Sequence, residues 1–355
     1  MAIARALDSQ AVTRRAGIVT RIGLAGWIAM AALAPCAAGT AAEERSPGEV
    51  LVVNTQDASV SRVDLAAMKE VGRFPVGERP YGIAVTRDGR TVAVGVEGEE
   101  KVKFFAADGF APLGEVRIGP MYNDHLALSA DGASVLVANF HSDDVVGIDV
   151  ASRREAFRIE GASAPHVIKY GPMRKLAYVT CKKITGIASI DPAKRALVDF
   201  HQTNVNPRSL TFSPDESRLY FASFWVDGFF EMDRTAGKVT RLIALPPPAE
   251  DAAPREVTYH GVEAVGENLV LAANEGRSYL DAVDVESGRL VERLRQGISQ
   301  PCCVERIPGS DPTRAIVSNL GDGSVTIVEV ARGGGLRSVA TLKVGKAPKR
   351  VAFLP

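Results

Sequence analysis

Two cysteines, Cys302 and Cys303, stand next to each other in the segment QPCCVERI. The chain has 355 residues but only four cysteines, so an adjacent pair is unusual. Two neighbouring thiols can close a vicinal disulfide, or they can give two thiolates to a metal ion. We favour a disulfide between Cys302 and Cys303, which would brace the loop and would also be open to reduction.

Three histidines, His125, His166 and His260, occupy the same place as Cys302 in segments of similar sequence, such as APHVIKY and TYHGVEAV. Imidazole and thiolate bind copper, zinc or iron, so a metal or haem cofactor held by His125, His166, His260 and Cys302 is one interpretation. It would make the chain a redox protein or an accessory factor for one.

A polar pocket for a small ligand is the second interpretation of this position. Arg208 would offer a planar fork to a carboxylate or phosphate, and Lys349 a point charge. The candidate ligand-binding residues are Tyr81, His125, His166, Arg208, His260 and Lys349. The acidic residues that would orient the histidines or bind a cation are Asp124, Asp143, Asp144 and Glu263. A third interpretation needs no site, because single histidines are commonly hydrogen-bonded surface residues.

The elements that must position these residues form an internal repeat. Seven short apolar runs end at equivalent residues, 42 to 51 positions apart: Asn54, Val96, Asn139, Cys181, Ser223, Asn274 and Asn319. Ten residues after each, a second run ends, in most copies at an aspartate such as Asp64 or Asp149. The recurring Asp and Asn residues are expected to serve turns and strand pairing, because every copy needs the same backbone geometry there.

Each copy contains four short alternating runs separated by Gly, Asp or Pro turns, as in YGIAV, RDGR and TVAVGV. Four strands in about 40–45 residues predict one blade of a β-propeller, so the fold class is all-β with seven four-stranded antiparallel blades. The chain begins on a second-strand run and ends on a first-strand run. We therefore expect Arg350–Leu354 to pair with Leu51–Asn54, which closes the ring.

The segments RLYFAS, LAYVTC, VLVANF and VGKAPKRVAF resemble the YVTN family of β-propeller repeats, and the resemblance covers Glu49–Pro355. The resemblance implies a seven-bladed propeller related in fold to haem d1-binding domains, amine dehydrogenase heavy chains and lactonases. It implies little about activity, because these relatives differ in chemistry.

Strand direction alternates within a blade, so the segments entering the seven innermost strands share one face. We expect the residues at this position to ring the mouth of the central channel: Tyr81, His125, His166, Arg208, His260, Cys302 and Lys349. His141, His201 and Cys181 are expected at the same end. A Pro-rich insertion, residues 243–257, is expected on this face as a lid or partner contact.

The N-terminus has the pattern of an export signal, with arginines followed by a short apolar run and small residues. We expect residues 1–42 to be a cleaved signal peptide and residues 43–355 to be a single propeller domain. The paired Arg14 and Arg15 leave the twin-arginine and general secretory routes open. The mature chain would then work in the periplasm or be secreted.

The charge is balanced, with 42 basic and 42 acidic residues, and basic–aromatic clusters are lacking, so we expect no nucleic-acid partner. No segment after the signal is long and apolar enough for an integral membrane span. The predicted function is an exported, monomeric propeller that binds a small molecule or a periplasmic protein at the channel mouth. Whether it is an enzyme stays open.

Overall fold

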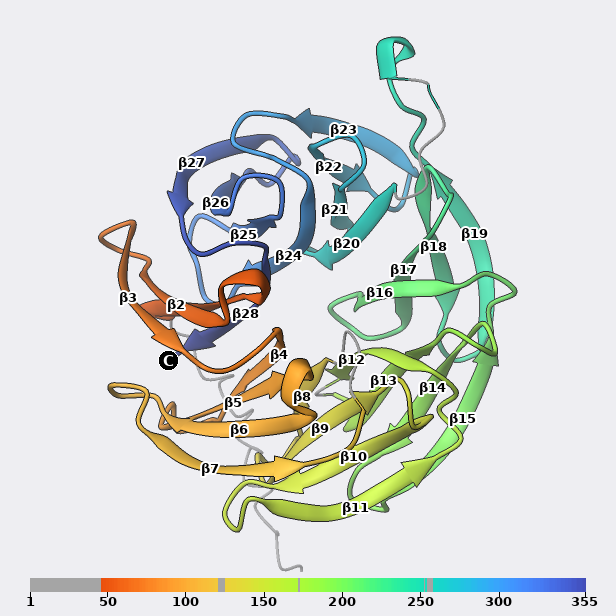
Figure 1. Cartoon of the computed structure of the whole chain (residues 1–355). Coiled ribbons are helices and arrows are strands. Elements are labelled where there is room, and N and C mark those ends of the chain that lie inside the picture. Colours follow the sequence, from red (N-terminus) through yellow and green to blue (C-terminus); the bar gives the residue numbers. More distant parts are fainter. Residues whose placement is uncertain (1–45, 121–124, 172, 252, 254–257) are drawn as a thin grey trace, which may run out of the picture. The chain divides into compact units, whose positions relative to one another are not determined.

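The computed structural model describes residues 46–120, 125–171, 173–251, 253 and 258–355; the predicted signal peptide lies outside them. The compact unit Glu43–Pro355 is built from seven four-stranded antiparallel sheets. The sheets stand like blades around a common centre (Figure 1). No helix in the described ranges is long and apolar enough to cross a membrane. The predicted seven-bladed all-β propeller is confirmed.

In every blade the four strands follow one another from the centre to the rim. The innermost strands are β28 (Pro348–Leu354), β4 (Pro80–Val85), β8 (Leu126–Leu128), β12 (Pro165–Gly171), β16 (Pro207–Phe212), β20 (Tyr259–Ala264) and β24 (Pro301–Ile307). The second strands are β1 (Glu49–Asn54), β5 (Thr91–Val96), β9 (Ser134–Asn139), β13 (Leu176–Cys181), β17 (Arg218–Ser223), β21 (Leu269–Asn274) and β25 (Arg314–Asn319).

The third and fourth strands complete the blades. The third strands are β2 (Ser59–Asp64), β6 (Lys101–Ala106), β10 (Asp144–Asp149), β14 (Gly186–Asp191), β18 (Gly228–Asp233), β22 (Tyr279–Asp284) and β26 (Ser324–Val330). The outermost are β3 (Lys69–Pro75), β7 (Pro112–Arg117), β11 (Arg154–Glu160), β15 (Ala196–Gln202), β19 (Lys238–Ala244), β23 (Arg289–Leu294) and β27 (Leu336–Lys343). Three short 3-10 turns are η1 (Thr55–Asp57), η2 (Glu97–Glu99) and η3 (Ala249–Asp251).

One blade is assembled from both ends of the described chain. The last strand, β28, pairs antiparallel with the first, β1, with Glu49 opposite Leu354 and Val52 opposite Val351. Its sheet has the order β28-β1-β2-β3. The predicted closure is therefore confirmed. It ties the two ends of the propeller together, so this blade also has four strands.

The core lies between neighbouring blades. The second strands are buried along almost their whole length, because each faces a neighbouring sheet on both sides. Leu51 and Val53 of β1, for example, share one apolar cluster with Val92 and Val94 of β5. Each such side chain contributes about 1.5–3 kcal/mol when fully buried. The outermost strands alternate between exposed and half-buried residues, as β3 does, since only one of their faces is covered.

The recurring aspartates and asparagines serve the scaffold. The Asp64 carboxylate accepts hydrogen bonds from the backbone N–H groups of Ala66 and Ala67 in the turn after β2. The Asn54 amide donates to the hydroxyls of Ser59 and Ser61 on β2. These side chains are used for turns and strand pairing, as the repeat predicts.

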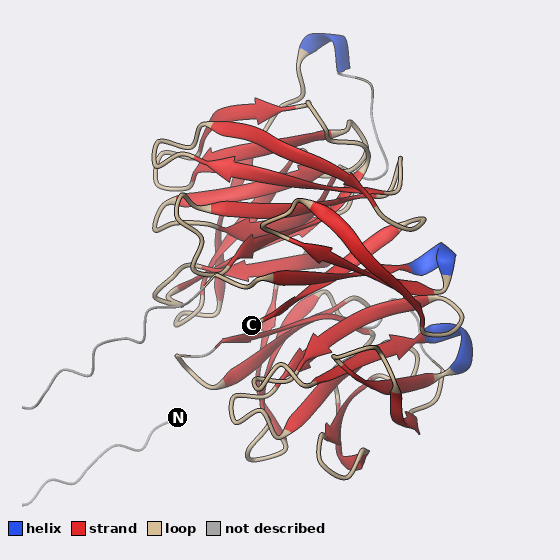
Figure 2. Ribbon diagram, turned by 90° about the vertical axis from the view of Figure 1, so that its left-hand side faces the viewer, coloured by secondary structure: helices blue, strands red, loops and turns tan. Residues whose placement is uncertain are grey.

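The innermost strands share a further local feature that positions the channel residues. Most of them shift register just after their first residue; in β4, Pro80 lies opposite Val96, and the next partner is Ile83, opposite Val94. Such a bulge bends the strand and re-aims the side chains within it. Figure 2 shows the loops gathered at the two ends of the strands. The innermost strands all enter their blades in the same direction, so their bulged starts share one end.

Candidate functional site

Six of the seven residues predicted at the channel mouth are the second residue of an innermost strand, and His125 directly precedes β8; together they form one layer. We call this set the mouth layer: Tyr81, His125, His166, Arg208, His260, Cys302 and Lys349. Five of them are almost fully buried, with Tyr81, His166 and His260 each 2% exposed, His125 5% and Cys302 0%. They therefore lie beneath the mouth and not on its open rim.

Contacts run from one member of the mouth layer to the next. The rings of Tyr81 and His125 are 5.7 Å apart between centroids, and those of His125 and His166 are 5.5 Å apart. On the other side of Tyr81, the Lys349 Nζ lies 5.3 Å from the centre of the Tyr81 ring. The Cys302 thiol donates to the Lys349 carbonyl oxygen at 3.9 Å. The bulges thus bring side chains from separate blades into one connected set.

Glu275, which directly follows β21, joins two members of the mouth layer. Its carboxylate lies 2.5 Å from Nδ1 of His260 and 3.7 Å from Nη2 of Arg208. The Arg208 guanidinium also stacks on Phe224, with 4.3 Å from Cζ to the ring centre. Glu275 was not a sequence candidate, because it comes from a loop between strands two and three, and only the fold brings it to the innermost strands.

Three basic side chains of this region keep buried nitrogen atoms without a hydrogen-bond partner among the described residues. These atoms are Nε and Nη1 of Arg208, Nε2 of His260 and Nε of Arg350. The arginine atoms are donors, whereas Nε2 of His260 is an acceptor, because Nδ1–H of this ring donates to the Glu275 carboxylate. A buried donor that stays unpaired costs about 1–3 kcal/mol, and more when it is charged. Such atoms therefore point to a partner that the protein chain itself does not supply.

Arg350 is a residue of the site that the sequence did not single out. It follows Lys349 on β28, it donates to Nε2 of His125, and it lines a channel cavity of about 230 Å³. Strand alternation predicts that neighbours on a strand point opposite ways. The bulge in β28 breaks that alternation, so Lys349 and Arg350 both serve the channel. The sequence signal that could have indicated Arg350 is the basic pair Lys349–Arg350 in β28, a strand that is otherwise apolar.

The electrostatics of the mouth layer are dominated by positive charge. Burial lowers the pKa of His125, His166 and His260 well below the usual value, and the neighbouring cations Arg208, Lys349, Arg350 and Lys182 lower it further. The three imidazoles are therefore neutral at pH 7. Neutral imidazoles surrounded by cations form an environment that favours an anion.

An aromatic rim lies above the mouth layer. Lys182 Nζ sits 5.9 Å from the ring centre of Phe140 and 5.4 Å from that of Phe224, both of which follow second strands. Burial and then the charge of Arg208 lower the pKa of Lys182 to about 8. The neighbouring Trp225 is 69% exposed. The rim thus combines apolar ring faces with one lysine, Lys182, whose charge is lost as the pH rises past about 8.

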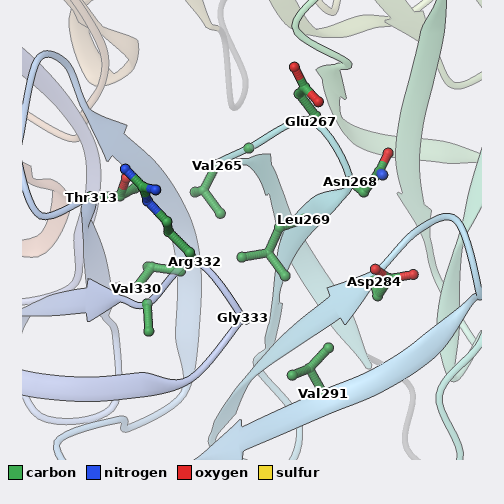
Figure 3. A pocket seen from close by; sticks show the side chains of 12 residues that line it. Val265, Glu267, Asn268, Leu269, Asp284, Val291, Thr313, Val330, Arg332 and Gly333 are labelled. Atoms are coloured by element: carbon green, nitrogen blue, oxygen red, sulfur yellow. The ribbon is translucent and has the colours of Figure 1, made fainter.

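A cavity of about 720 Å³ opens next to the mouth layer, lined among others by Tyr81, Lys349, Arg79 and Gln300. This volume is within the range of small-ligand pockets. A different cavity of about 660 Å³ lies at the opposite ends of the strands, between the blades of β20 and β24 (Figure 3). Its lining includes Leu269 and Arg332 and none of the candidate residues.

Deeper in the channel, charged residues are paired with one another. Lys169 of β12 forms an ion pair with Glu263 of β20 and lies 3.6 Å from Glu305 of β24. The Thr211 hydroxyl donates to Glu263 at 3.1 Å. We call this set the inner layer. The suggested role of Glu263 in orienting a histidine is not what the geometry shows, since its carboxylate is bound by Lys169 and Thr211.

The cysteines fall into two environments. Cys302 and Cys303 are present as thiols with their sulfurs 3.0 Å apart, so the vicinal disulfide stays a prediction. Cys181 lies in the apolar cluster of blade core residues around β13, where burial raises the pKa of its thiol to about 12. Cys181 lies at the expected end, opposite Pro165 at the start of β12, but its side chain packs into the blade core and not into the channel.

The two remaining histidines are not part of the mouth layer. His201 lies in the outermost strand β15, where Nε2 is 3.5 Å from the Asp199 carboxylate. His141 is exposed beyond the end of β9. In the insertion, η3 stands away from the ring of sheets in Figure 1, and residues 252 and 254–257 lie outside the described ranges. Asp124 lies outside them as well.

The geometry offers little to a resident metal ion. Within the described ranges, no group of three or more His, Cys, Asp or Glu side chains is placed to hold one. The positive charges of Arg208, Lys349 and Arg350 around the imidazoles also oppose a cation. Copper, zinc or iron bound by His125, His166, His260 and Cys302 therefore stays a prediction that these contacts do not support.

The fold and its central layers define a seven-bladed β-propeller with a basic site at one end of the channel. Solved structures similar to this chain include Kuenenia stuttgartiensis hydrazine synthase, with 17% identity over 83% of this chain and 99% of that chain, and a TM-score of 0.68. The Pseudomonas aeruginosa periplasmic gluconolactonase is 18% identical over 86% of this chain and 99% of that chain, with a TM-score of 0.68.

A dihydro-haem d1 dehydrogenase, solved with its ligand, is 17% identical over 86% of this chain and 75% of that chain, with a TM-score of 0.62. At these identities the likeness shows the fold alone. No protein family model and no curated protein matches the chain.

Proposed function

We propose that the protein binds a small anionic ligand, bearing a carboxylate or phosphate, at the mouth layer. The observation that carries the proposal is the set of buried, unpartnered nitrogen atoms on Arg208 and Arg350. Hydrogen bonds from charged donors are worth about 1.5–3 kcal/mol each, so an anion that reaches these atoms would be held firmly.

The shape of the site supports a small ligand. The aromatic rim of Phe140 and Phe224 would exclude water from a bound anion. The Lys349 ammonium lies against the Tyr81 ring, and both residues line the open cavity. One structural neighbour is named a periplasmic gluconolactonase, which makes sugar acids a sensible first class of ligand to test.

We propose that this binding takes place outside the cytoplasm. The basic residues, the apolar run and the small residues within the first 42 positions support export to the periplasm or beyond. A monomeric state and a periplasmic protein partner stay predictions. Fractionation of cells that produce the full chain would check the export, since a chain that stays uncleaved in the cytoplasm would contradict it.

Titration calorimetry tests the anion site directly. Gluconate, citrate and phosphate are titrated into the wild-type protein and into Arg208→Met. The expected result is micromolar to millimolar binding of at least one anion, weakened about tenfold to hundredfold in the variant. Arg117→Met is the matched control, because Arg117 has a 69% exposed side chain on an outermost strand. Equal binding by all three proteins, or binding by none, would overturn the proposal.

A carboxylate-bearing redox cofactor of the haem type is the second candidate. The unpartnered Nε2 of His260 favours it, because imidazole is a common axial ligand of haem. The basic side chains of Arg208 and Lys349 would then pair with the carboxylates of the macrocycle. An absorption spectrum of the exported protein decides this point. A visible band lost in His260→Ala would support the cofactor, and a colourless protein that binds gluconate or phosphate would reject it.

A further inference from the structure

The cavity of about 720 Å³ beside the mouth layer is enclosed by loops of three blades. They are the loop after β1, the turn η2 after β5, and the segments that lead into β4, β24 and β28. Tyr81 and Lys349 belong both to the mouth layer and to the lining of this cavity. A ligand whose anionic group lies at the mouth layer can therefore extend into the cavity, which has room for a chain of several carbon atoms.

The charged side chains that line the cavity balance one another. Arg79 and Lys349 are basic, and Glu78 and Glu97 are acidic. The Gln300 amide, also in the lining, both donates and accepts hydrogen bonds. Such a lining favours neither sign of charge and suits neutral groups that donate and accept, as hydroxyl groups do. A hydrocarbon chain would instead leave these polar groups without partners.

Glu97 is the residue of this lining whose burial calls for an explanation. Its side chain is only 2% exposed, although glutamate is rarely buried without a strong partner. Arg79 Nη2 lies 3.4 Å from the Glu97 carboxylate, but the Arg79 side chain is 63% exposed, so water weakens this pair. Because a carboxylate offers several acceptor positions, Glu97 can serve a protein donor and ligand hydroxyls together.

A second polar group of the lining favours the same kind of ligand. Oγ1 of Thr55 is buried and has no hydrogen-bond partner among the described residues. Thr55 lies in η1 and Glu97 in η2, so the two side chains come from equivalent turns after the second strands β1 and β5. A threonine hydroxyl can donate to a ligand hydroxyl or accept from it. The cavity thus presents hydroxyl-binding groups from both turns.

We propose that the ligand of the mouth layer is a polyhydroxylated organic anion, whose hydroxyl groups occupy this cavity and are selected by Glu97. The inference rests on the proposed function, because it names the ligand class of the same site. Ligand hydroxyls replace the water that Glu97 loses when the cavity is filled, whereas a hydrocarbon chain removes the water and gives no hydrogen bond in return. Glu97 is therefore a specificity-determining residue.

Two anions of equal charge and chain length test the selection. Gluconate carries hydroxyl groups along its chain and hexanoate carries none, and each is titrated into the full chain by calorimetry. Gluconate should bind about tenfold to hundredfold more tightly than hexanoate. Equal affinities, or binding of phosphate or citrate without binding of gluconate, would overturn the inference and leave the anion site standing. Binding of none of these anions would overturn the proposed function and the inference together.

Glu97→Leu should bring the affinities for gluconate and hexanoate to within about threefold of each other. Glu97→Gln should keep part of the preference, because its amide oxygen still accepts hydrogen bonds. Glu99→Leu is the matched control, since Glu99 lies in the same turn, pairs with Lys103 at 2.7 Å and does not line the cavity. A preference that persists in Glu97→Leu, or that is lost equally in Glu99→Leu, would overturn the role of Glu97.

Thr55→Val gives an independent measurement and decides the point if the Glu97→Leu chain does not fold. The change removes the hydroxyl and keeps the shape of the side chain. It should weaken gluconate about threefold and leave hexanoate unchanged. An equal change for both anions, or no change for either, would show that the hydroxyl groups of the ligand lie outside this cavity and would overturn the inference.

Discussion

The mouth layer and the inner layer lie on the same innermost strands, but the charged groups are fully paired in the inner layer and only partly paired in the mouth layer. In the inner layer, Lys169 is matched by Glu263 and Glu305, and Thr211 completes the hydrogen bonding. In the mouth layer and the adjoining Arg350, the cations outnumber the one carboxylate that contacts them, and buried nitrogen atoms of Arg208 and Arg350 lack partners among the described residues.

The difference separates a structural role from a binding role. A buried charge is tolerated when the protein supplies its partner, and the inner layer follows this rule. The mouth layer violates it at several residues together. Departures from full polar satisfaction are expected at functional sites, where a ligand provides the missing partner. The comparison therefore assigns scaffold to one layer and ligand binding to the other.

Breaking the inner pair should give the largest effect on stability. Lys169→Met leaves Glu263 and Glu305 without a cation, and removing one member of a buried pair costs about 3 kcal/mol or more. Urea unfolding measures the loss. Lys183→Met removes a surface pair with Asp143 in which both side chains are well exposed, so it should cost less than about 0.5 kcal/mol. Equal losses in the two variants would contradict the structural role of Lys169.

The buried histidines should make the protein sensitive to acid. Their pKa values lie well below 6.5 in the folded state, whereas in the unfolded chain they are about 6.5. Protons therefore bind more strongly to the unfolded chain, and stability falls as the pH drops below 6.5. The loss is about 1 kcal/mol per histidine between pH 6.5 and 5.5.

His166→Asn should reduce the loss of stability between pH 6.5 and 5.5 by the contribution of one histidine, about 1 kcal/mol. The asparagine amide can still donate to the Arg208 carbonyl oxygen, as Nδ1 of His166 does at 3.4 Å. Urea unfolding at the two pH values gives the slope for each protein. If the variant keeps the wild-type slope, His166 is not buried in its neutral form.

Anion affinity should fall as the pH rises from 6 to 9. Lys182, with a pKa of about 8, loses its positive charge in this range, and Cys303, with a pKa of about 7, gains a negative one. Both changes weaken binding of an anion. Lys182→Met should remove the part of the decrease near pH 8, about threefold for one partly exposed charge. A titration series with gluconate measures it, and an affinity that rises with pH would contradict the sign.

The smallest effect on stability is expected at Arg208, because the protein does not supply a partner for each nitrogen of its guanidinium group. Arg208→Met should change the free energy of unfolding by less than about 1 kcal/mol, because the lost stacking on Phe224 is offset by the removed cost of a poorly paired charge. Its effect should appear in anion affinity instead. A loss as large as that of Lys169→Met would erase the distinction between the two layers.

The sequence predicts the scaffold well, because each blade repeats the same apolar pattern and the same turn residues. It also gives the repeated position that forms the mouth layer, since Tyr81 and His166 occupy equivalent places after a proline. It does not predict Arg350, because a bulge changes the phase of the strand. It does not predict Glu275 either, since this residue lies in the loop after β21 and its contacts join His260 of the same blade to Arg208 of the neighbouring one. Cys181 lies at the expected end, opposite Pro165, but the sequence does not show that its thiol packs in the blade core.

The most direct test is a crystal structure of the full chain grown with selenate, an anion that anomalous scattering locates without ambiguity. The account predicts a selenate ion in the channel within hydrogen-bonding distance of Arg208 and Arg350, and its absence in crystals of Arg208→Met. Selenate found only on exposed surface residues, with the nitrogen atoms of Arg208 and Arg350 bonded to water or protein, would contradict the assignment of the mouth layer as an anion site.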